Sequence, residues 1–238
     1  MMKRVCVLGS NSFIGKNMLR DETMWEGISR KELDLLRGDK VDEFFGTHMY
    51  DVVIHCCVRG GSRLHKDGGD VTHDNILMFE NVVRHLGKSF PTLLYFSSGA
   101  ALRGEPPTDP YGLSKWIIDK RIQQLEGAHS LRIWGCYGPD EPLTRFSSVC
   151  VREGHVVIPQ DRYFDFIDVC DVKRVVHEYV EGSRDDKECN LVYPEKMLLS
   201  QWATWFGATF EITQPHTMGE NYCCSSPIRS GMQTRLQV

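Results

Sequence analysis

The sequence has little of what a membrane-spanning or nucleic-acid-binding protein needs. No apolar run approaches the roughly 20 residues that a helix requires to cross a bilayer. The 28 Lys and Arg are outnumbered by 32 Asp and Glu, so the formal net charge is −4 and there is no basic excess for binding phosphate backbones. Low-complexity tracts are also absent. We therefore expect neither a membrane nor a nucleic acid as a partner.

A disulfide framework is missing as well, although the chain has nine cysteines. Their number is odd, the chain is too long for a disulfide-stapled mini-domain, and Cys6 lies in an apolar run typical of a buried strand. The adjacent pairs at 56–57 and 223–224 do not have the spacing of zinc ligands, so we expect no metal. The N-terminal stretch has no long apolar segment of a signal peptide. These absences predict a reducing compartment, the cytoplasm.

What the chain does have is a regular alternation of strand-like and helix-like segments over its first 138 residues. With 238 residues, 41% of them apolar, it can form a large domain with a small appendage. Strands are expected at 3–8, 27–29, 51–55, 93–96 and 131–134, and helices at 13–20, 41–45, 75–86 and 111–125. The strands lack alternating polarity, which is typical of a parallel sheet covered on both faces. We therefore predict an α/β fold, a Rossmann-type doubly wound parallel sheet, with ligands at the carboxyl ends of the strands.

Beyond residue 138 the pattern weakens. Short strands are expected at 155–159, 163–169 and 189–194, and helices at 172–180 and 198–206. We predict a dinucleotide-binding domain over 1–138 and a small C-terminal substrate cap over 139–238, interleaved with the sheet.

The sequence VLGSNSFIG at 7–15 places a tight turn between the first strand and a helix. Gly9 allows the turn, and Gly15 lets the helix pack close to the sheet. Backbone N–H groups at the start of such a helix can hold a pyrophosphate. An ordinary strand-to-helix turn is the alternative, but the position directly after the first strand favours a nucleotide site.

A second motif, Tyr111-Gly112-Leu113-Ser114-Lys115, puts a tyrosine and a lysine on one face of a helix. A lysine ammonium beside a phenol favours the phenolate and lowers the tyrosine pKa from about 10. Such a tyrosine can exchange a proton with a substrate hydroxyl or carbonyl. The spacing alone is common on solvated helices. Here, however, it follows a buried strand that ends in Ser97 and Ser98, where a hydrogen-bond donor to a substrate oxygen is expected.

Seven segments now form an ordered set: VLGSNSFIG, DVVIHCC, the helix with Asn75, FSSGA, PYGLSK, LRIWGCYGP and FDFIDVCDV. Over almost the whole chain this set resembles the extended short-chain dehydrogenase/reductases, the sugar-nucleotide epimerase/dehydratase family. Residues 28–55 especially resemble the branch of GDP-fucose synthase and dTDP-4-dehydrorhamnose reductase. The resemblance implies an NAD(P)-dependent oxidoreductase acting on a nucleotide-linked 4-keto sugar. Epimerase or dehydratase chemistry on the same residues is the alternative.

The resemblance also implies roles for single residues. Tyr111 would be the acid/base and would also border the cofactor. Lys115 would lower the pKa of Tyr111 and bind the ribose, and Ser98, or else Ser97, would supply the hydroxyl that orients the substrate oxygen. The other residues expected to line the cofactor are Gly9, Asn11, Ser12, Phe13, Ile14, Gly15, Asp34, Leu35, Cys56, Cys57, Val58, Asn75 and Ile133. Those expected at the substrate are Ser98, Gly135, Cys136, Arg145 and Arg162.

The prediction of which cofactor is preferred depends on Arg30. NAD-preferring relatives place an acid after the second strand, where this chain has Ser29-Arg30-Lys31. A guanidinium pairs with a 2′-phosphate, often bidentately, whereas a carboxylate repels it. We therefore predict that NADP(H) is preferred and NAD(H) is possible. An exposed basic turn without a ligand is the alternative.

Several positions depart from the family pattern. Ser12 replaces the middle glycine of the phosphate turn, residues 101–104 replace the usual VYG, and Gly135 replaces an asparagine near the substrate. The segment between 139 and 164 is short, which weakens the inference of a nucleotide sugar more than that of the cofactor. Gly99 and Ala100 supply no Cys–His or Asp–Glu pair, so reduction or C4 epimerisation is favoured.

Two further interpretations stay open. One is a non-catalytic NADP(H)-binding sensor or assembly protein, and the other is an isomerase of a metabolite without a nucleotide. For His55 we expect a satisfied core residue, and for Asn75 either a hydrogen bond to backbone or a helix-start cap. The helices at 75–86 and 111–125 resemble those that pair in dimers of this family, so we predict a homodimer.

Overall fold

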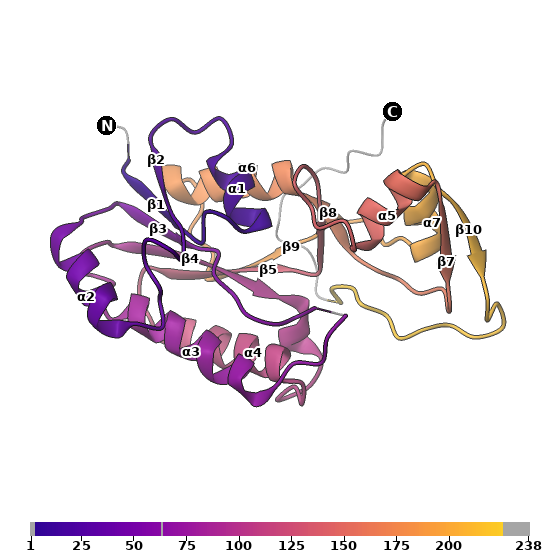
Figure 1. The fold of residues 1–238 in the computed structure, drawn as a ribbon, viewed down its shortest axis with the longest axis horizontal. Helices are drawn as coiled ribbons and strands as arrows, with labels where there is room; N and C mark the ends of the chain where they lie inside the picture. The colour runs from indigo at the N-terminus through magenta and orange to yellow at the C-terminus, as the bar shows by residue number, and fades with distance from the viewer. Residues whose placement is uncertain (1–2, 63, 226–238) are drawn as a thin grey trace. The chain divides into compact units, whose positions relative to one another are not determined.

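The computed structural model describes residues 3–62 and 64–225 (Figure 1). The last part of the predicted cap, 226–238, lies outside the described residues. The chain divides into two compact units, Met1–Arg132 with Lys173–Cys189, and Ile133–Val172 with Asn190–Val238. The predicted boundary after residue 138 falls inside the second unit, and the chain returns to the first unit at residue 173.

The first unit is built on a six-stranded sheet with the order β2-β1-β3-β4-β5-β9. The strands are β1 (Val5–Leu8), β2 (Trp25–Ile28), β3 (Val52–His55), β4 (Thr92–Ser98), β5 (Ala128–Ile133) and β9 (Glu188–Leu191). β1 pairs in parallel with both β2 and β3, and β3 pairs in parallel with β4. The order reverses at β1, because the chain first adds β2 on one side and then β3 on the other. The predicted doubly wound sheet is confirmed, and its switch point lies at the carboxyl end of β1.

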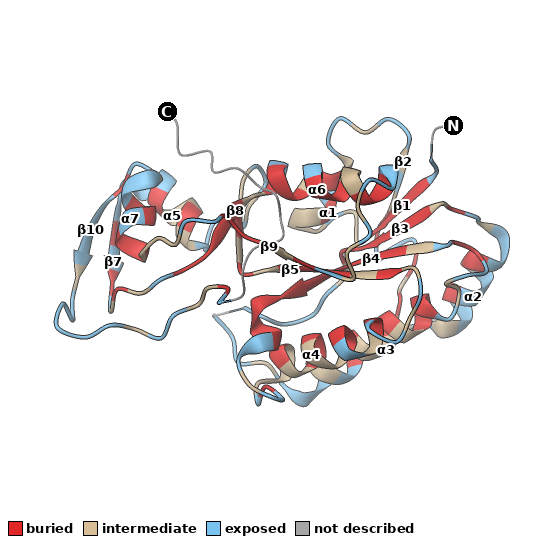
Figure 2. Ribbon diagram, turned by 180° about the vertical axis from the view of Figure 1, so that it is seen from behind, coloured by how far each residue is buried: buried red, intermediate tan, exposed pale blue. Residues whose placement is uncertain are grey.

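Helices cover both faces of this sheet (Figure 1). They are α1 (Phe13–Leu19), α2 (Gly38–Thr47), α3 (Gly69–Val83), the 3-10 helix η1 (Gly99–Leu102), α4 (Pro110–Ile122) and α6 (Val169–Glu181). α2, α3 and α4 lie on one side and α1 and α6 on the other. The main apolar core packs between the sheet and α2 to α4, and β1, β3 and β4 are almost wholly buried (Figure 2).

Local sequence explains where α4 begins. Asp109 precedes it and accepts a hydrogen bond from Gly112 N at 2.7 Å, and Pro110 occupies the first helical position. A side-chain cap followed by proline is a strong signal for a helix start. α3 shows the opposite case: it begins at Gly69, earlier than the predicted residue 75, because its polar first turns carry no apolar periodicity.

The second unit consists of small paired elements. β6 (Gly135–Tyr137) pairs in parallel with β8 (Phe166–Asp168), and β7 (His155–Ile158) with β10 (Thr209–Ile212). The helices are α5 (Phe146–Glu153) and α7 (Leu199–Trp205). Sequence periodicity missed β6, α5 and β10, because they are short and β10 exposes three of its four residues. None of the helices in 3–62 and 64–225 combines the length and apolar character that crossing a membrane requires.

Candidate active site

The turn after β1 requires glycine at two places. Gly9 has a φ of +83°, and a Cβ there would lie 2.9 Å from Cys57 Sγ. A Cβ on Gly15 would lie 2.2 Å from Gly9 O, so α1 could not start this close to the turn with another residue. Ser12 caps α1, because its hydroxyl accepts a hydrogen bond from Gly15 N at 3.0 Å. The serine at the family's middle glycine is therefore accommodated as a helix cap.

The carboxyl end of β2 lies beside this turn. Gly9 N and Ser10 N both donate to Ile28 O, at 2.8 and 3.2 Å. Two residues further on, Arg30 is exposed, with its guanidinium 3.4 Å from the carboxylate of Asp34. A guanidinium at this strand end suits a 2′-phosphate, which it can pair bidentately.

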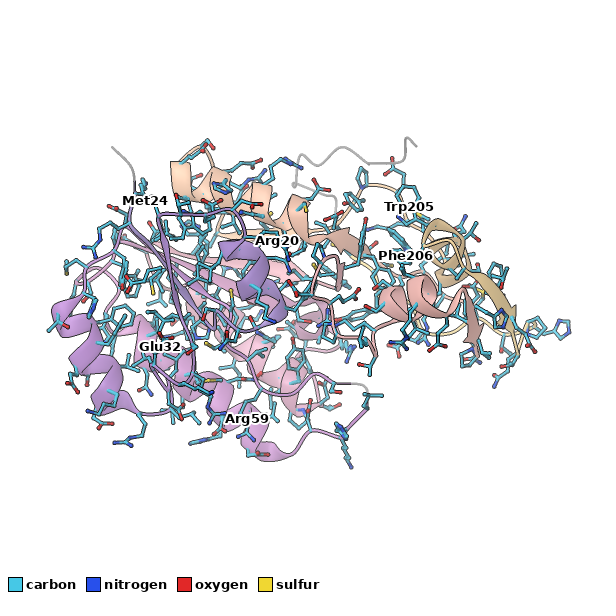
Figure 3. The ribbon with its side chains drawn as sticks, turned by 45° about the horizontal axis from the view of Figure 1, so that its top comes forward. Arg20, Met24, Glu32, Arg59, Trp205 and Phe206 are labelled. Carbon is cyan, nitrogen blue, oxygen red and sulfur yellow. The ribbon has the colours of Figure 1, made fainter. Side chains whose placement is uncertain are left out.

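The carboxylates near Arg30 are engaged elsewhere or reach it only loosely. Glu32, labelled in Figure 3, accepts a hydrogen bond from Ser29 N at 2.7 Å, and the contacts with Ser29 lower its pKa. Asp34 is half-buried. Leu35 lies in the core, where Asn81 donates to its carbonyl at 2.7 Å.

The end of β3 places two thiols next to the phosphate turn. Cys56 is buried, Cys57 is half-buried against Gly9, and Val58 is exposed. Burial raises the pKa of Cys57 to about 12 and that of Cys56 well above its ordinary value. Both are therefore neutral thiols near neutral pH, and they shape the turn by packing rather than by charge.

Lys115 is buried inside the first unit, at 2% exposure. Its Nζ donates to Tyr95 OH at 2.8 Å and to Phe96 O at 2.7 Å, and lies 5.7 Å from the centre of the Tyr111 ring. Burial lowers the pKa of Lys115 from 10.5 to about 7, and the field of Asp119 opposes this shift. The ammonium near Tyr111 therefore gains or loses its charge close to neutral pH.

The serine at the end of β4 meets the start of α4. Ser98 caps η1, since its hydroxyl accepts a hydrogen bond from Ala100 N at 3.2 Å. η1 packs closely on α4, where a Cβ on Gly112 would lie 2.8 Å from Ala100 O. Gly112 follows Tyr111 in the chain, and Lys115 Nζ donates a hydrogen bond to Phe96 O, near the carboxyl end of β4. The fold thus brings Ser98, Tyr111 and Lys115 into one region.

Asn75 lies in the middle of α3 and not at its start, so the cap interpretation is wrong. Its Oδ1 accepts from Arg59 N at 2.8 Å, and its Nδ2 donates to Arg59 O at 3.0 Å and to Ser114 Oγ at 3.0 Å. The predicted hydrogen bond to backbone is confirmed. The amide connects the chain after β3 to α4.

Two buried polar side chains at the strand ends are unsatisfied. His55 is 1% exposed, and neither ring nitrogen has a hydrogen-bond partner among the described residues. Burial lowers the pKa of His55 to about 3, aided by the charge of Lys115. The expectation of a core histidine was right. Ser97 Oγ is also buried, with no partner in the described part of the chain.

The remaining candidates of the first unit lie along the turn after β1. Asn11 is exposed, and Phe13 and Ile14 are half-buried, which is compatible with the border of a ligand site. Ile133, at the end of β5, is half-buried and is the first residue of the second unit.

The substrate candidates Gly135, Cys136, Arg145 and Arg162 belong to the second unit. A Cβ on Gly135 would lie 2.7 Å from ring atoms of both Phe164 and Phe166, so this glycine makes room for aromatic packing. Burial raises the pKa of Cys136 well above its ordinary value, which disfavours the thiolate of an acid/base.

The two arginines of this group differ in their contacts. Arg145 is exposed and donates to Cys136 O at 3.3 Å. Arg162 is half-buried, and its Nε has no hydrogen-bond partner among the described residues.

Sequence reasoning missed three residues around Tyr111 and Lys115. Tyr95 supplies a hydroxyl to Lys115, and Asp119 lies one helical turn beyond Lys115. The four-residue spacing of Asp119 from Lys115 was a usable signal. Gly61 approaches the Tyr111 ring, which no local pattern indicates.

Three features of the first unit fit a dinucleotide-dependent short-chain dehydrogenase/reductase. They are the glycine turn at the switch point, the basic residue after the second strand and the Tyr–Lys pair on α4. The chain belongs to the NAD dependent epimerase/dehydratase family, which it matches over residues 5–191. No curated protein matches the sequence significantly.

Solved structures share this fold at low sequence identity. The dTDP-4-dehydrorhamnose reductase from Bacillus anthracis str. Ames, in complex with NADP, has a TM-score of 0.76 and 17% identity, over 94% of this chain and 89% of that one. The GDP-mannoheptose C4 reductase from Campylobacter jejuni, with NADP bound, has a TM-score of 0.77 and 15% identity, over 100% and 96%. The UDP-N-acetylglucosamine 4-epimerase from Bacillus cereus has a TM-score of 0.70 and 15% identity, over 89% and 86%.

Proposed function

We propose that the protein is an NADP(H)-dependent reductase of a nucleotide-linked 4-keto sugar, with Tyr111 as its acid/base. The observation that carries this proposal is the buried ammonium of Lys115, held by two neutral oxygens beside the Tyr111 ring. A binding protein without turnover has no use for a tuned phenol, whereas proton transfer to a carbonyl oxygen needs one. Two similar structures carry NADP, and both are named as C4 or 4-dehydro sugar reductases.

The cofactor is held by residues of the first unit. The glycine turn at Gly9 and Gly15 takes the pyrophosphate, Arg30 pairs with the 2′-phosphate, and Cys57 borders the turn. Lys115 contributes a hydrogen bond to the ribose. When bound, NADPH supplies the hydride for the sugar carbon.

The chain itself moves the proton. The phenol of Tyr111 gives its proton to the C4 oxygen of the sugar, while the Ser98 hydroxyl donates a hydrogen bond to the same oxygen and orients it. The Lys115 charge stabilises the phenolate that remains. Because the pKa of Lys115 is lowered to about 7, the lysine can supply charge or receive a proton near neutral pH.

The test combines a binding titration with a substrate screen. We expect tighter binding of NADPH than of NADH, and oxidation of NADPH by one of the dTDP-, GDP- or UDP-linked 4-keto sugars. In Tyr111→Phe, kcat should fall about 10³-fold, with the Kd for NADPH within about threefold because the phenol oxygen is not a main cofactor contact.

Other outcomes give other functions. Conversion of a nucleotide sugar to its C4 epimer without net oxidation of NADPH would indicate an epimerase. NADPH binding without turnover of any sugar nucleotide would favour the sensor, and full activity of Tyr111→Phe would refute the mechanism. We further propose a cytoplasmic homodimer, which light scattering at micromolar concentration tests.

A further inference from the structure

A second turn with two glycines, Gly60 and Gly61, follows β3 and reaches the ring of Tyr111. Gly60 and Gly61 have φ values of +75° and +74°, a backbone region that favours glycine. A Cβ on Gly61 would lie 2.9 Å from both Cε2 and Cζ of Tyr111 and 3.1 Å from Cδ2. The main chain at Gly61 therefore lies directly against the ring edge next to the phenol carbon. Any side chain at residue 61 would overlap the ring, because real Cβ atoms do not approach aromatic carbons so closely.

The turn at Gly60 and Gly61 is anchored before Gly61 and at the Gly61 N–H. Asn75 bonds both the N–H and the C=O of Arg59, at 2.8 and 3.0 Å, and Asp67 Oδ2 accepts from Gly61 N at 2.8 Å. Arg59, labelled in Figure 3, forms ion pairs with Asp70, at 3.1 Å, and with Asp74 in the first turns of α3. A segment with two flexible glycines is thereby held in one place.

The same asparagine also holds the helix that carries the tyrosine. Asn75 Nδ2 donates to Ser114 Oγ at 3.0 Å, and the Ser114 hydroxyl donates to Tyr111 O at 2.7 Å. A continuous series of hydrogen bonds thus runs from the Arg59 backbone through Asn75 and Ser114 to the Tyr111 backbone. The position of the turn relative to Tyr111 is consequently set by a series of hydrogen bonds, of which that between Asn75 and Ser114 is buried and those to the Arg59 and Tyr111 backbones are partly buried.

We propose that Gly61 positions Tyr111 for proton transfer: its main chain forms a fixed wall against one edge of the ring, so that the phenol keeps one rotamer. This inference rests on the proposed role of Tyr111 as acid/base. The reason that residue 61 is glycine is then twofold, the positive φ and the absence of a Cβ. Only the second reason concerns the reaction.

A matched pair of variants separates these two reasons. Gly61→Ala adds both the backbone strain and the clash with the ring. Gly87→Ala adds the same kind of strain at a φ of +79°, but no atom of the described residues lies within 4 Å of its Cβ. Both should lose similar stability. We expect kcat of Gly61→Ala to fall about 30-fold, with KM and the NADPH Kd within about twofold, because a small misplacement of a reacting group lowers the rate of the chemical step. Gly87→Ala should keep kcat within about twofold of wild type.

A measurement that needs no substrate accompanies the kinetics. The protein is labelled with 3-fluorotyrosine, and the 19F resonance of Tyr111 is assigned from its absence in Tyr111→Phe. We expect this resonance to move in Gly61→Ala and to stay in place in Gly87→Ala. If Gly61→Ala does not fold, Asp67→Ala replaces it. That variant frees the Gly61 N–H at the surface, and the Tyr111 resonance should then broaden.

The outcomes keep the two proposals apart. An unmoved Tyr111 resonance together with unchanged kcat in Gly61→Ala would overturn the positioning role and leave the reductase intact. Failure of the wild type to turn over any sugar nucleotide would overturn the reductase, while the resonance would still report whether Gly61 holds the ring. Equal losses of kcat in Gly61→Ala and Gly87→Ala would mean that strain alone acts, and would also overturn the inference.

Discussion

Lys115 in the first unit and Lys196 in the second show two ways to place a lysine among buried groups. Lys115 donates to a phenol and a carbonyl, both neutral. Lys196 is half-buried and donates to both oxygens of the Asp165 carboxylate, at 2.9 and 2.7 Å. The second arrangement fixes a charge by pairing it, as buried charges usually require. The first leaves the lysine able to titrate near neutral pH, which suits a catalytic position.

The carboxylates of the two units complete this contrast. Asp119 acts on Lys115 through its field, but its oxygens are bonded to Ser130 and to Arg132, at 2.7 and 2.8 Å. Asp165, in contrast, is the direct partner of Lys196 and also accepts from Cys224 N at 2.6 Å. The carboxylate of Asp119 thus holds a buried arginine, whereas that of Asp165 connects Lys196 to the backbone at Cys224.

The largest effect should come from exchanging the two lysines for methionine, one at a time. Lys115→Met should lower kcat about 10³-fold, because the phenolate loses its stabilising charge. Lys196→Met should leave kcat within about threefold but lower the free energy of unfolding by about 2 kcal/mol, because Asp165 loses its cationic partner and keeps only the Cys224 N–H. Steady-state kinetics and chemical denaturation of both variants measure this. A comparable loss of kcat in Lys196→Met would break the contrast.

Asp119→Asn tests whether the carboxylate in the first unit is structural. Arg132 and Asp119 are both nearly inaccessible, so removing one charge should lower the free energy of unfolding by about 3 kcal/mol. Replacing both residues, Asp119→Leu with Arg132→Met, should recover part of that loss, because the buried guanidinium, which keeps only the more exposed Glu188 as its carboxylate partner in Asp119→Asn, is then removed as well. Urea denaturation of the single and double variants gives the comparison. A double variant less stable than Asp119→Asn would contradict the pairing argument.

The pH dependence of stability follows from the lowered pKa of Lys115. Above about pH 7 the folded protein has released the proton, whereas the unfolded chain keeps it up to about pH 10.4. Because the unfolded state then binds more protons, stability rises with pH from about 7 to about 10.4, and this contribution is lost progressively as the pH falls back to 7. From pH 7 to 9 the free energy of unfolding of wild type should gain about 2 kcal/mol over that of Lys115→Met. Parallel curves for the two proteins would show that Lys115 does not titrate there.

The smallest effect is expected at the exposed cation of the cofactor site. Arg30→Ala should raise the Kd for NADPH about tenfold, the loss of one charge-assisted contact, and leave the Kd for NADH within about twofold. Arg37→Ala is the matched control, since that residue is also exposed and paired with a nearby carboxylate, Asp39. Fluorescence titrations of both variants decide the matter. Equal changes for the two cofactors would remove Arg30 from the recognition of the 2′-phosphate.

Local patterns in the sequence were sufficient to predict most strands of the first unit and the residues at its strand ends. Apolar runs without alternation predicted β1, β3, β4 and β5, because a strand buried on both faces has no polar side to reveal. The phosphate turn could be read from Gly9 and Gly15, and the Tyr–Lys pair from its four-residue spacing. The second unit was harder to predict, since its strands have three or four residues and pair only in twos.

By itself, then, the sequence determined the parallel sheet, the turn at its switch point and the side chains available for proton transfer, because each depends on neighbours a few residues apart. Tertiary structure alone decided what surrounds those side chains. Tyr95 reaches Lys115 from 20 positions away, and Arg132 reaches Asp119 from 13. Gly61 meets Tyr111 only because the chain that follows β3 folds against the start of α4. Such contacts follow from strand order and packing, so the pKa of Lys115 and the orientation of Tyr111 are properties of the fold.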